Sequence, residues 1–206
     1  MFHVEHSLRP NDVSRETLGA LEQFSSLLLR WNRTVNLIAP GDEPLLWKRH
    51  IADSLQLASL IHQPCNRAID LGSGAGFPGL ILALATNLAF DLIEADQRKA
   101  AFLREAARIT RAAVHVHAVR IEASDLPRAS LITARGLAPL PKLLGLAAPL
   151  LAPGGQCLFL KGANVQTELT HAAAQWHMQV ERIPSRTAPD ACILRISDLH
   201  RVVPTA

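Results

Sequence analysis

The first 64 residues place apolar side chains at the three- and four-residue spacing of amphipathic helices. One helix is predicted over residues 14–31, with a buried side made of Leu18, Leu21, Leu28 and Trp31. Its N-cap would be Asn11, Asp12 or Ser14. A second helix is predicted over residues 43–61 behind the cap residue Asp42, with a buried side made of Leu46, Ile51, Leu55 and Leu60.

From residue 67 onward the pattern changes to short apolar runs that alternate with helical stretches. Strands are predicted over residues 67–71, 89–94, 113–118, 129–133 and 156–161. Helices are predicted over residues 78–86, 97–109, 139–151 and 165–176. Such an alternation is typical of a parallel sheet with helices on both faces.

Two further strands are predicted over residues 178–183 and 191–197, with only the loop PSRTAPDA between them. A connection this short cannot cross over between parallel strands, so the pair is expected to form an antiparallel hairpin at one edge. The predicted fold is α/β: a Rossmann-like, mostly parallel sheet with N-terminal helices. We expect residues 1–64 to form a helical cap packed on a main domain over residues 65–206, as a single compact unit.

Length and composition narrow the class of protein. The chain has 206 residues, of which 49% are hydrophobic, enough for one domain with a sizeable core. Its longest nearly apolar run, residues 77–90, is interrupted by proline and polar residues and is too short for a membrane span. The opening MFHVEHSLRPND has early charges and lacks the apolar stretch of a signal peptide. We therefore expect a soluble cytoplasmic protein.

Cysteine and histidine usage gives no sign of a metal. Cys65, Cys157 and Cys192 are widely spaced and match neither a disulfide framework nor a zinc site. The nine histidines show no metal-ligand spacing, so we expect reduced thiols and no metal. The net charge of +3 permits an anionic partner without identifying one.

A glycine-rich turn, GSGAGFPG over residues 72–79, follows the strand 67–71 and leads into a helix. An ordinary tight turn, the alternative interpretation, needs one or two glycines, whereas this segment has four. Backbone amides at such a turn commonly hold a ligand. A dinucleotide fingerprint would place glycine where Phe77 stands, and a triphosphate loop would end in Gly-Lys-Ser/Thr. Neither pattern matches.

Acidic residues beside the turn favour a ligand without phosphates. Asp70, at the end of the strand, would repel a diphosphate and suit an amino group. Glu94, at the end of the next strand, would accept hydrogen bonds from both hydroxyls of a ribose, although it could also be a solvated acid. These features predict S-adenosylmethionine, bound at Gly72 and Gly74. Residues 120–122 lie where the adenine edge is expected.

The end of the fourth strand, LITARGLAPLPK, is expected to face the methyl acceptor. It lacks the Asn/Asp-Pro-Pro-aromatic pattern of adenine amino methylation, and no cysteine is placed for methylation of a pyrimidine carbon. The N7 atom of guanine has a free lone pair and needs alignment more than a general base. Arg135 could hydrogen-bond the cofactor carboxylate or guanine O6, or form a structural salt bridge.

Basic residues gather in two groups. Those on the helix 97–109 are interpreted as a solvated face. In the first group, phosphate contacts to RNA and solvated helix faces are both open. The candidates for RNA binding are Arg33, Lys48, Arg49 and His50.

Several segments occur in a characteristic order: WNRTVNLI, RHIADS, IDLGSGAGFPG, LIEADQRKAAFLRE, RIEA, ARGLA and LKG. With them the chain resembles the glucose-inhibited division protein B family of bacterial small-subunit rRNA guanine-N7 methyltransferases. The resemblance implies a seven-stranded class I S-adenosylmethionine-dependent methyltransferase fold, acting on guanine 527 of 16S rRNA in the small ribosomal subunit or its precursor. It also implies cofactor contacts at Gly72, Phe77, Ile121, Glu122 and Arg135. We expect a monomer.

Three other functions remain open from the residues alone. A small-molecule methyltransferase shares the fold and would need an enclosed apolar acceptor pocket. A non-catalytic assembly factor would bind cofactor and ribosome without forming product. A nicotinamide oxidoreductase is disfavoured because the third glycine of its fingerprint is misplaced.

Overall fold

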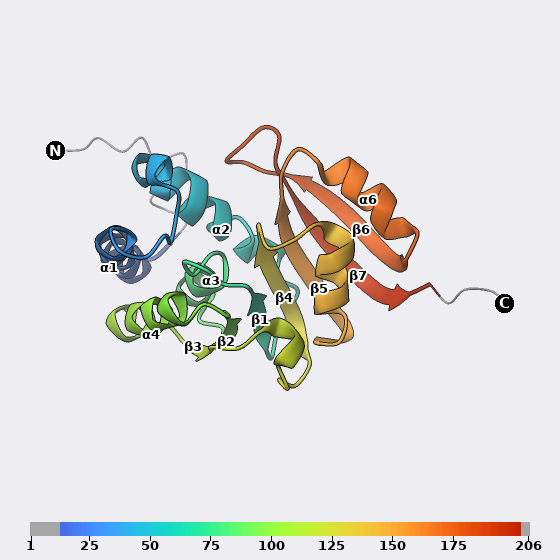
Figure 1. Ribbon diagram of the computed structural model, residues 1–206, viewed down its shortest axis with the longest axis horizontal. Coiled ribbons are helices and arrows are strands. Elements are labelled where there is room, and N and C mark those ends of the chain that lie inside the picture. Colours follow the sequence, from blue (N-terminus) through green and yellow to red (C-terminus); the bar gives the residue numbers. More distant parts are fainter. Residues whose placement is uncertain (1–12, 203–206) are drawn as a thin grey trace.

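The computed structural model describes residues 13–202 and is built around one seven-stranded sheet (Figure 1). The strand order is β3-β2-β1-β4-β5-β7-β6. The strands are β1 (Ala68–Leu71), β2 (Phe90–Ile93), β3 (Val114–His117), β4 (Ala129–Arg135), β5 (Leu151–Lys161), β6 (Trp176–Pro184) and β7 (Cys192–Arg201). Strands β1 to β5 pair in parallel, and β7 is antiparallel to both β5 and β6. The predicted parallel sheet with a C-terminal antiparallel hairpin is confirmed.

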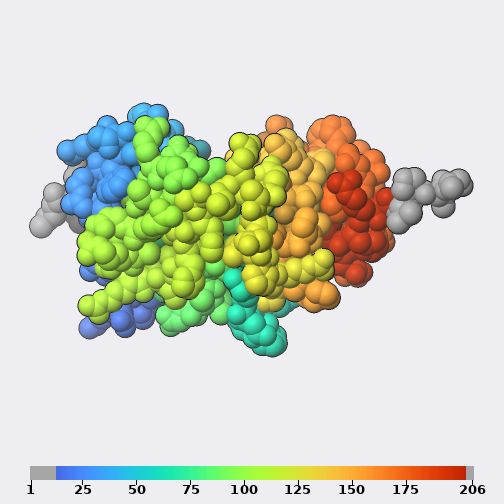
Figure 2. All heavy atoms as spheres, turned by 60° about the horizontal axis from the view of Figure 1, so that its bottom comes forward, coloured from blue at the N-terminus to red at the C-terminus, as the bar shows by residue number. Residues whose placement is uncertain are grey.

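Helices cover both faces of the sheet. They are α1 (Arg15–Asn32), α3 (Gly79–Thr86), α4 (Gln97–Thr110), α5 (Leu140–Ala147) and α6 (Val165–Ala173). One hydrophobic cluster joins α1, α3 and α4 to the sheet, and a second joins α5 and α6 to the opposite face. The space-filling view shows the blue N-terminal segment beside green segments at one end of the molecule and the red C-terminal strands at the other end (Figure 2).

The N-terminal segment shares the first of these clusters. Phe24 on α1 meets the ring of Phe77 edge to face, with the ring centres 5.5 Å apart. Trp31 packs on Phe102 of α4, with the ring centres 5.8 Å apart. The boundary between residues 64 and 65 stays a prediction, since apolar side chains from both sides of it form one continuous core.

The first helix begins as its sequence predicts. Ser14 is the N-cap, and its hydroxyl accepts a hydrogen bond from the backbone N–H of Thr17 at 3.1 Å. The other two cap candidates, Asn11 and Asp12, lie outside the described residues.

The single helix predicted over residues 43–61 is wrong. In its place are a 3-10 helix η2 (Pro40–Leu45), a π-helical segment η3 (Leu46–Ala52), the short α2 (Asp53–Leu55) and a 3-10 turn η4 (Ala58–Leu60). The apolar residues assigned to its buried side are five, four and five positions apart, which an α-helix of 3.6 residues per turn cannot bring onto one stripe. Changes of helical pitch absorb this mismatch.

Some boundaries also differ near the C-terminal half of the sheet. The helix predicted over 139–151 ends at Ala147, and β5 starts at Leu151, five residues before its predicted start at 156. Its first residues pass through Pro153 and two glycines, so the pairing with β4 jumps from Ala129–Leu151 to Leu131–Gln156. This irregularity hides the early start of the strand from a pattern search. Both hairpin strands are longer than predicted.

The strand order changes direction between β1 and β4, where one connection leads toward β2 and the other toward β5. In open α/β sheets, ligands bind outside the carboxyl ends of the strands at such a switch point. The turns after β1, β2 and β4 meet there. Within residues 13–202, no helix is long and apolar enough to span a membrane.

Candidate functional site

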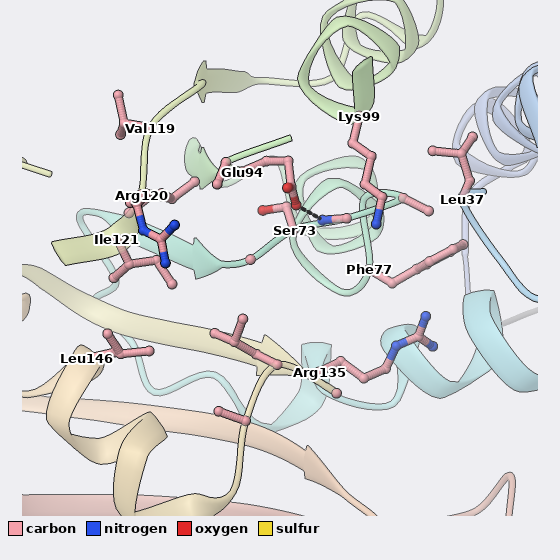
Figure 3. Close-up of a pocket in the computed structure, with 18 of the residues that line it drawn as sticks. Leu37, Ser73, Phe77, Glu94, Lys99, Val119, Arg120, Ile121, Arg135 and Leu146 are labelled. Carbon is pink, nitrogen blue, oxygen red and sulfur yellow. Dashed lines mark hydrogen bonds between the residues drawn. The ribbon is translucent and has the colours of Figure 1, made fainter. Parts of the chain in front are cut away.

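A cavity of about 540 Å³ lies at this switch point, within the size range of small-molecule sites. Its walls come from four parts of the chain: the N-terminal segment, the glycine turn, the ends of β2 and β3, and the segment after β4 (Figure 3). All seven residues predicted to bind the cofactor line it: Gly72, Gly74, Phe77, Glu94, Ile121, Glu122 and Arg135. The sequence therefore located this cavity, whose contacts with a cofactor stay predictions.

The four RNA-binding candidates do not lie together at the cavity. Of these, only His50 lines it, with a side chain 12% exposed. Arg33 and Lys48 are exposed outside it, and Arg49 forms an ion pair with Asp42. A role in RNA binding for the three outer residues stays a prediction.

Glu94 organises the glycine turn. One carboxylate oxygen accepts from the backbone N–H of Gly74 at 2.8 Å (Figure 3). The other accepts from the backbone N–H of Asp96, also at 2.8 Å. Gly74 has a φ of +55°, a conformation that L residues seldom adopt. A Cβ on Gly74 would meet no protein atom nearer than 3.8 Å. The glycine thus permits the backbone conformation and keeps that part of the cavity open.

Gly79 has a different purpose, which is close packing of α3 on the sheet. A Cβ there would lie 2.5 Å from the Cβ of Asp70 and 2.7 Å from a methyl of Leu92. The backbone of α3 therefore sits directly over β1. This close contact fixes where the turn leaves the sheet.

The prediction that Asp70 contacts the ligand is wrong. Its side chain is fully buried under α3 and is not part of the cavity wall, so it cannot meet an amino group of the ligand directly. Its Oδ1 accepts a hydrogen bond from the hydroxyl of Thr133 at 2.6 Å. Burial raises the pKa of Asp70 to about 6, although the hydrogen bonds from Thr133 and Ser73 oppose this shift. Its position at a strand end suggested a ligand contact. Side chains alternate between the two faces of a strand, and that of Asp70 faces α3.

Arg135 extends from the end of β4 toward the N-terminal segment (Figure 3). Its guanidinium lies over the ring of Phe77, 4.6 Å from the ring centre. One terminal nitrogen donates to the backbone carbonyl of Arg49 at 3.1 Å and lies 3.7 Å from the carboxylate of Asp53. The other is 2.7 Å from Nδ1 of His50. Arg135 is thus anchored to the RHIADS segment by three residues.

His50 lies between Arg135 and Asp42. A guanidinium only donates hydrogen bonds, so Nδ1 of His50 accepts from it, and the ring proton is on Nε2. Nε2 lies 3.2 Å from the carboxylate of Asp42. Burial and the charge of Arg135 lower the pKa of His50 to about 4, so the imidazole is neutral near pH 7.

Asp53 connects the cavity wall to the loop between β6 and β7. Its carboxylate accepts from the hydroxyl of Thr187 at 2.6 Å and from the amide of Gln56 at 2.8 Å. From the sequence alone, Asp42 is predicted to cap a helix, and no function is predicted for Asp53. The sequence signal for both contacts is that Asp42 and Asp53 flank the pair Arg49–His50 in the segment 42–53. A single continuous helix, as predicted, conceals this signal.

A second ion pair shapes the segment after β4. Lys161, at the end of β5, pairs with Glu168 of α6 and donates to the carbonyl of Ala138 at 3.1 Å. Glu168 also accepts from the backbone N–H of Leu140, the first residue of α5, at 2.7 Å. The pair therefore ties Ala138, which lines the cavity, and the start of α5 to the end of β5 and to α6.

The donor set fits S-adenosylmethionine. Glu94 faces the cavity beside an open glycine turn, as a ribose would require, and Ile121 supplies an apolar wall at the expected adenine position. Arg135 lines the same cavity and would offer a cation to the carboxylate of the methionine tail. When bound there, the cofactor supplies an electrophilic methyl group on a sulfonium.

Solved structures share the fold. A ribosomal protein L11 methylase from Lactobacillus delbrueckii subsp. bulgaricus has a TM-score of 0.55 at 20% identity, covering 70% of this chain and 77% of that one. An O-methyltransferase from Bacillus cereus, solved in complex with SAH, has a TM-score of 0.55 at 14% identity, covering 84% of this chain and 90% of that one. These similarities confirm the class I methyltransferase fold.

Sequence relatives are much closer. A ribosomal RNA small subunit methyltransferase G from Gluconobacter oxydans is 58% identical, over 93% of this chain and 98% of the relative. One from Granulibacter bethesdensis is 51% identical, over 98% of this chain and 100% of the relative. A family model described as rRNA small subunit methyltransferase G matches residues 17–192. With the fold, these relationships confirm S-adenosylmethionine as the cofactor. The chain belongs to the GidB family of rRNA small subunit methyltransferase G proteins.

Proposed function

We propose that this chain transfers a methyl group from S-adenosylmethionine to N7 of a guanine in 16S rRNA, guanine 527 by its resemblance to the family. The relatives' names support an rRNA of the small subunit as the substrate. The choice of base and atom rests on the chemistry of the cavity.

The charge of the cavity wall is the observation that carries the proposal. Lys99, Arg120 and Lys142 line the cavity in addition to Arg135, against the carboxylates of Glu94 and Glu122. Within residues 13–202, the side chains of Lys99, Arg120 and Lys142 form no hydrogen bond or ion pair with another side chain. Figure 3 shows Lys99 and Arg120 on either side of Glu94. Free cations at the cavity favour an acceptor that carries phosphates.

Neither a thiol nucleophile nor a free imidazole base is found at the cavity among the described residues. No cysteine is among the lining residues of the described chain, and Cys157 is fully buried on the other face of the sheet, where burial raises the pKa of its thiol. His50 is neutral but both of its ring nitrogens are engaged. An acceptor with an available lone pair, such as guanine N7, needs neither a base nor a covalent intermediate.

Arg135 has a defined part in this proposal. Its Nε has no hydrogen-bond partner among the described residues, and the N–H groups that Arg49, Asp53 and His50 leave unengaged are called the free edge of Arg135. Arginine usually contacts guanine through both O6 and N7, but the lone pair of N7 must stay free for attack on a methyl group. The free edge therefore suits O6 of the acceptor or the carboxylate of the cofactor, and it orients either one.

Other features of the proposal concern the partner. The exposed Arg33, Lys48 and Arg49 on the N-terminal segment would contact RNA phosphates outside the cavity. We infer that the chain acts as a cytoplasmic monomer on the small ribosomal subunit or its precursor.

The test is methylation of small ribosomal subunits from a strain that lacks the modification, with methyl-labelled S-adenosylmethionine. After digestion, the labelled nucleoside is identified by mass spectrometry, and its position is mapped by fragment analysis. N7-methylguanosine at position 527 is the expected product. Arg135→Ala is expected to lower turnover, while the exposed Arg108→Ala on α4 serves as the matched control.

Different results point to different alternatives. Cofactor binding without any labelled RNA would contradict the proposal and favour a small-molecule acceptor. Stable association with the subunit and no product in a single turnover would favour a non-catalytic assembly factor. A labelled nucleoside other than N7-methylguanosine would support 16S rRNA as the substrate and contradict guanine N7 as the acceptor atom.

A further inference from the structure

His50 has contacts that a simple wall residue would not need. Its ring stacks on Phe77 with the centres 5.1 Å apart and the planes 28° from parallel. The same phenylalanine ring lies under the guanidinium of Arg135. His50 and Arg135 thus rest on one aromatic surface while a 2.7 Å hydrogen bond joins them. The arrangement fixes the imidazole both in plane and in rotation.

We propose that His50 is a positioning residue for methyl transfer, because it holds the guanidinium of Arg135 in one orientation at the cavity wall. Asp42 acts through His50, since its carboxylate fixes the ring proton on Nε2 and leaves Nδ1 as an acceptor. The opposite side of the guanidinium is held by the carbonyl of Arg49 and by Asp53. The free edge of Arg135, which includes Nε, is what these contacts leave available to a ligand.

The direction of the hydrogen bonds matters to this inference. A guanidinium donates to every neighbour, so a histidine protonated on Nδ1 would oppose it with a second N–H. The charged and titratable groups that face His50 are Arg135 from β4, Asp42 from η2 and Arg49 on its own segment. Arg135 favours the neutral imidazole and Asp42 fixes its tautomer. The two neighbours together make His50 an acceptor toward Arg135.

The atom bound by the free edge is an oxygen, from either the carboxylate of the cofactor or O6 of the acceptor base. This part of the inference rests on the proposed function, whereas the orientation of Arg135 by His50 does not. A carboxylate partner predicts that loss of the His50 contact weakens cofactor binding. An O6 partner predicts that it lowers kcat or raises KM for the RNA with cofactor affinity retained.

Two substitutions separate the two hydrogen bonds of the ring. In His50→Asn the amide oxygen takes the place of Nδ1 and accepts from Arg135, but the side chain no longer reaches Asp42. In His50→Gln the terminal amide takes the place of Nε2 and donates to Asp42, but the acceptor for Arg135 is lost. Both are neutral and of similar polarity, so each is the control for the other.

The experiment measures cofactor affinity by calorimetry, kcat and KM with deficient small subunits, and Tm for both variants. His50→Gln is expected to lose about 10- to 100-fold in kcat/KM or in cofactor affinity, the loss typical of a misplaced orienting group. His50→Asn is expected to stay within about threefold of the unsubstituted chain. Equal losses in both variants, or no loss in His50→Gln, would overturn the inference.

A spectroscopic measurement keeps the inference testable if no RNA product is found. Nitrogen-15 NMR of the histidine rings at pH 7 reports which nitrogen carries the proton without any methyl transfer. The expected state of His50 is neutral with the proton on Nε2. A proton on Nδ1 would refute the assignment even if the methyltransferase assay succeeds.

Discussion

Asp70 illustrates how burial decides what a single carboxyl can do. The sequence places it at the strand end before the glycine turn, and from that position alone it resembles a ligand contact. In the fold, its side chain packs between β1 and α3, with Oδ2 lacking any hydrogen-bond partner among the described residues. An ionised carboxylate in such a place is unfavourable, and this accounts for its raised pKa of about 6.

This residue should make stability depend on pH. Between its ordinary pKa of 3.8 and about 6, the folded chain holds the proton that the unfolded chain has lost. The contribution of Asp70 to the free energy of unfolding therefore falls as pH rises through this window. Asp70→Asn lacks this titration. Its free energy of unfolding is therefore expected to rise by about 1.4 kcal/mol relative to that of the unsubstituted chain when the pH is raised from 5 to 8.

Urea unfolding of both chains at pH 5 and pH 8 checks this expectation. The exposed Asp125→Asn serves as the control for a general effect of the substitution. A stability difference between Asp70→Asn and the unsubstituted chain that stays constant across this range would show that Asp70 is ionised at both pH values.

Gly74 is the other residue with a sharp expectation. Valine there would face a positive φ and place two methyl groups in the space that the glycine leaves open beside Glu94. We expect Gly74→Val to reduce affinity for S-adenosylmethionine by more than about 100-fold, measured by calorimetry. The control is Gly19→Ala on α1, where no atom lies within 4 Å of the new Cβ and helix propensity improves. If Gly74→Val retains its affinity for S-adenosylmethionine, the cofactor does not bind at this turn.

At the scale of elements, the regular strands and helices could be predicted from the sequence, whereas the irregular helical segment near the N-terminus could not. Strands β1 to β4 and helices α3 and α4 follow simple periodicities, so their positions were predicted within about two residues. The segment 40–60 was misread, because prolines and irregular apolar spacing change its helical pitch in a way that no single period describes. The cavity was found, since glycine turns and strand ends are local signals. The contact between His50 and Arg135 joins residues 85 positions apart and leaves no local signal.

The tie between β5 and α6 leads to a prediction about the turn after β4. Glu168→Gln removes the charge that pairs with Lys161 and weakens the hydrogen bond to Leu140 N–H. Both side chains are largely buried, so we expect a loss of about 2 kcal/mol in the free energy of unfolding. Amides of residues 136–140 are expected to exchange faster with deuterium.

Hydrogen exchange followed by mass spectrometry reads out this region directly. Glu105→Gln, which breaks an exposed ion pair with Arg108, is the matched control and should change little. Unaltered exchange in Glu168→Gln would mean that the turn is held without the ion pair.

For the whole molecule, the shared core determines how the chain unfolds. Leu21, Phe24 and Leu28 of α1 are completely buried in the cluster that also contains Leu80 and Phe102. Separating the N-terminal segment from the sheet would expose all of them. We therefore expect residues 13–202 to unfold in one cooperative transition, as the single compact unit predicted from the sequence would.

Two single-tryptophan variants test this cooperativity. One retains Trp31 on α1, and the other retains Trp176 on β6, with phenylalanine in place of the remaining tryptophans. Their urea midpoints, followed by fluorescence, are expected to coincide with each other and with circular dichroism. Separate midpoints would show that the N-terminal segment unfolds as a domain of its own.

The common core also has a kinetic consequence for the cavity. Leu37, Ile38 and His50 form part of its wall from a segment whose apolar side chains cannot swing outward without exposing that core to water. This part of the cavity wall is therefore formed in the folded protein before any ligand binds. Cofactor association should then be a one-step encounter with a pre-formed site, with an observed rate that rises linearly with cofactor concentration and shows no plateau.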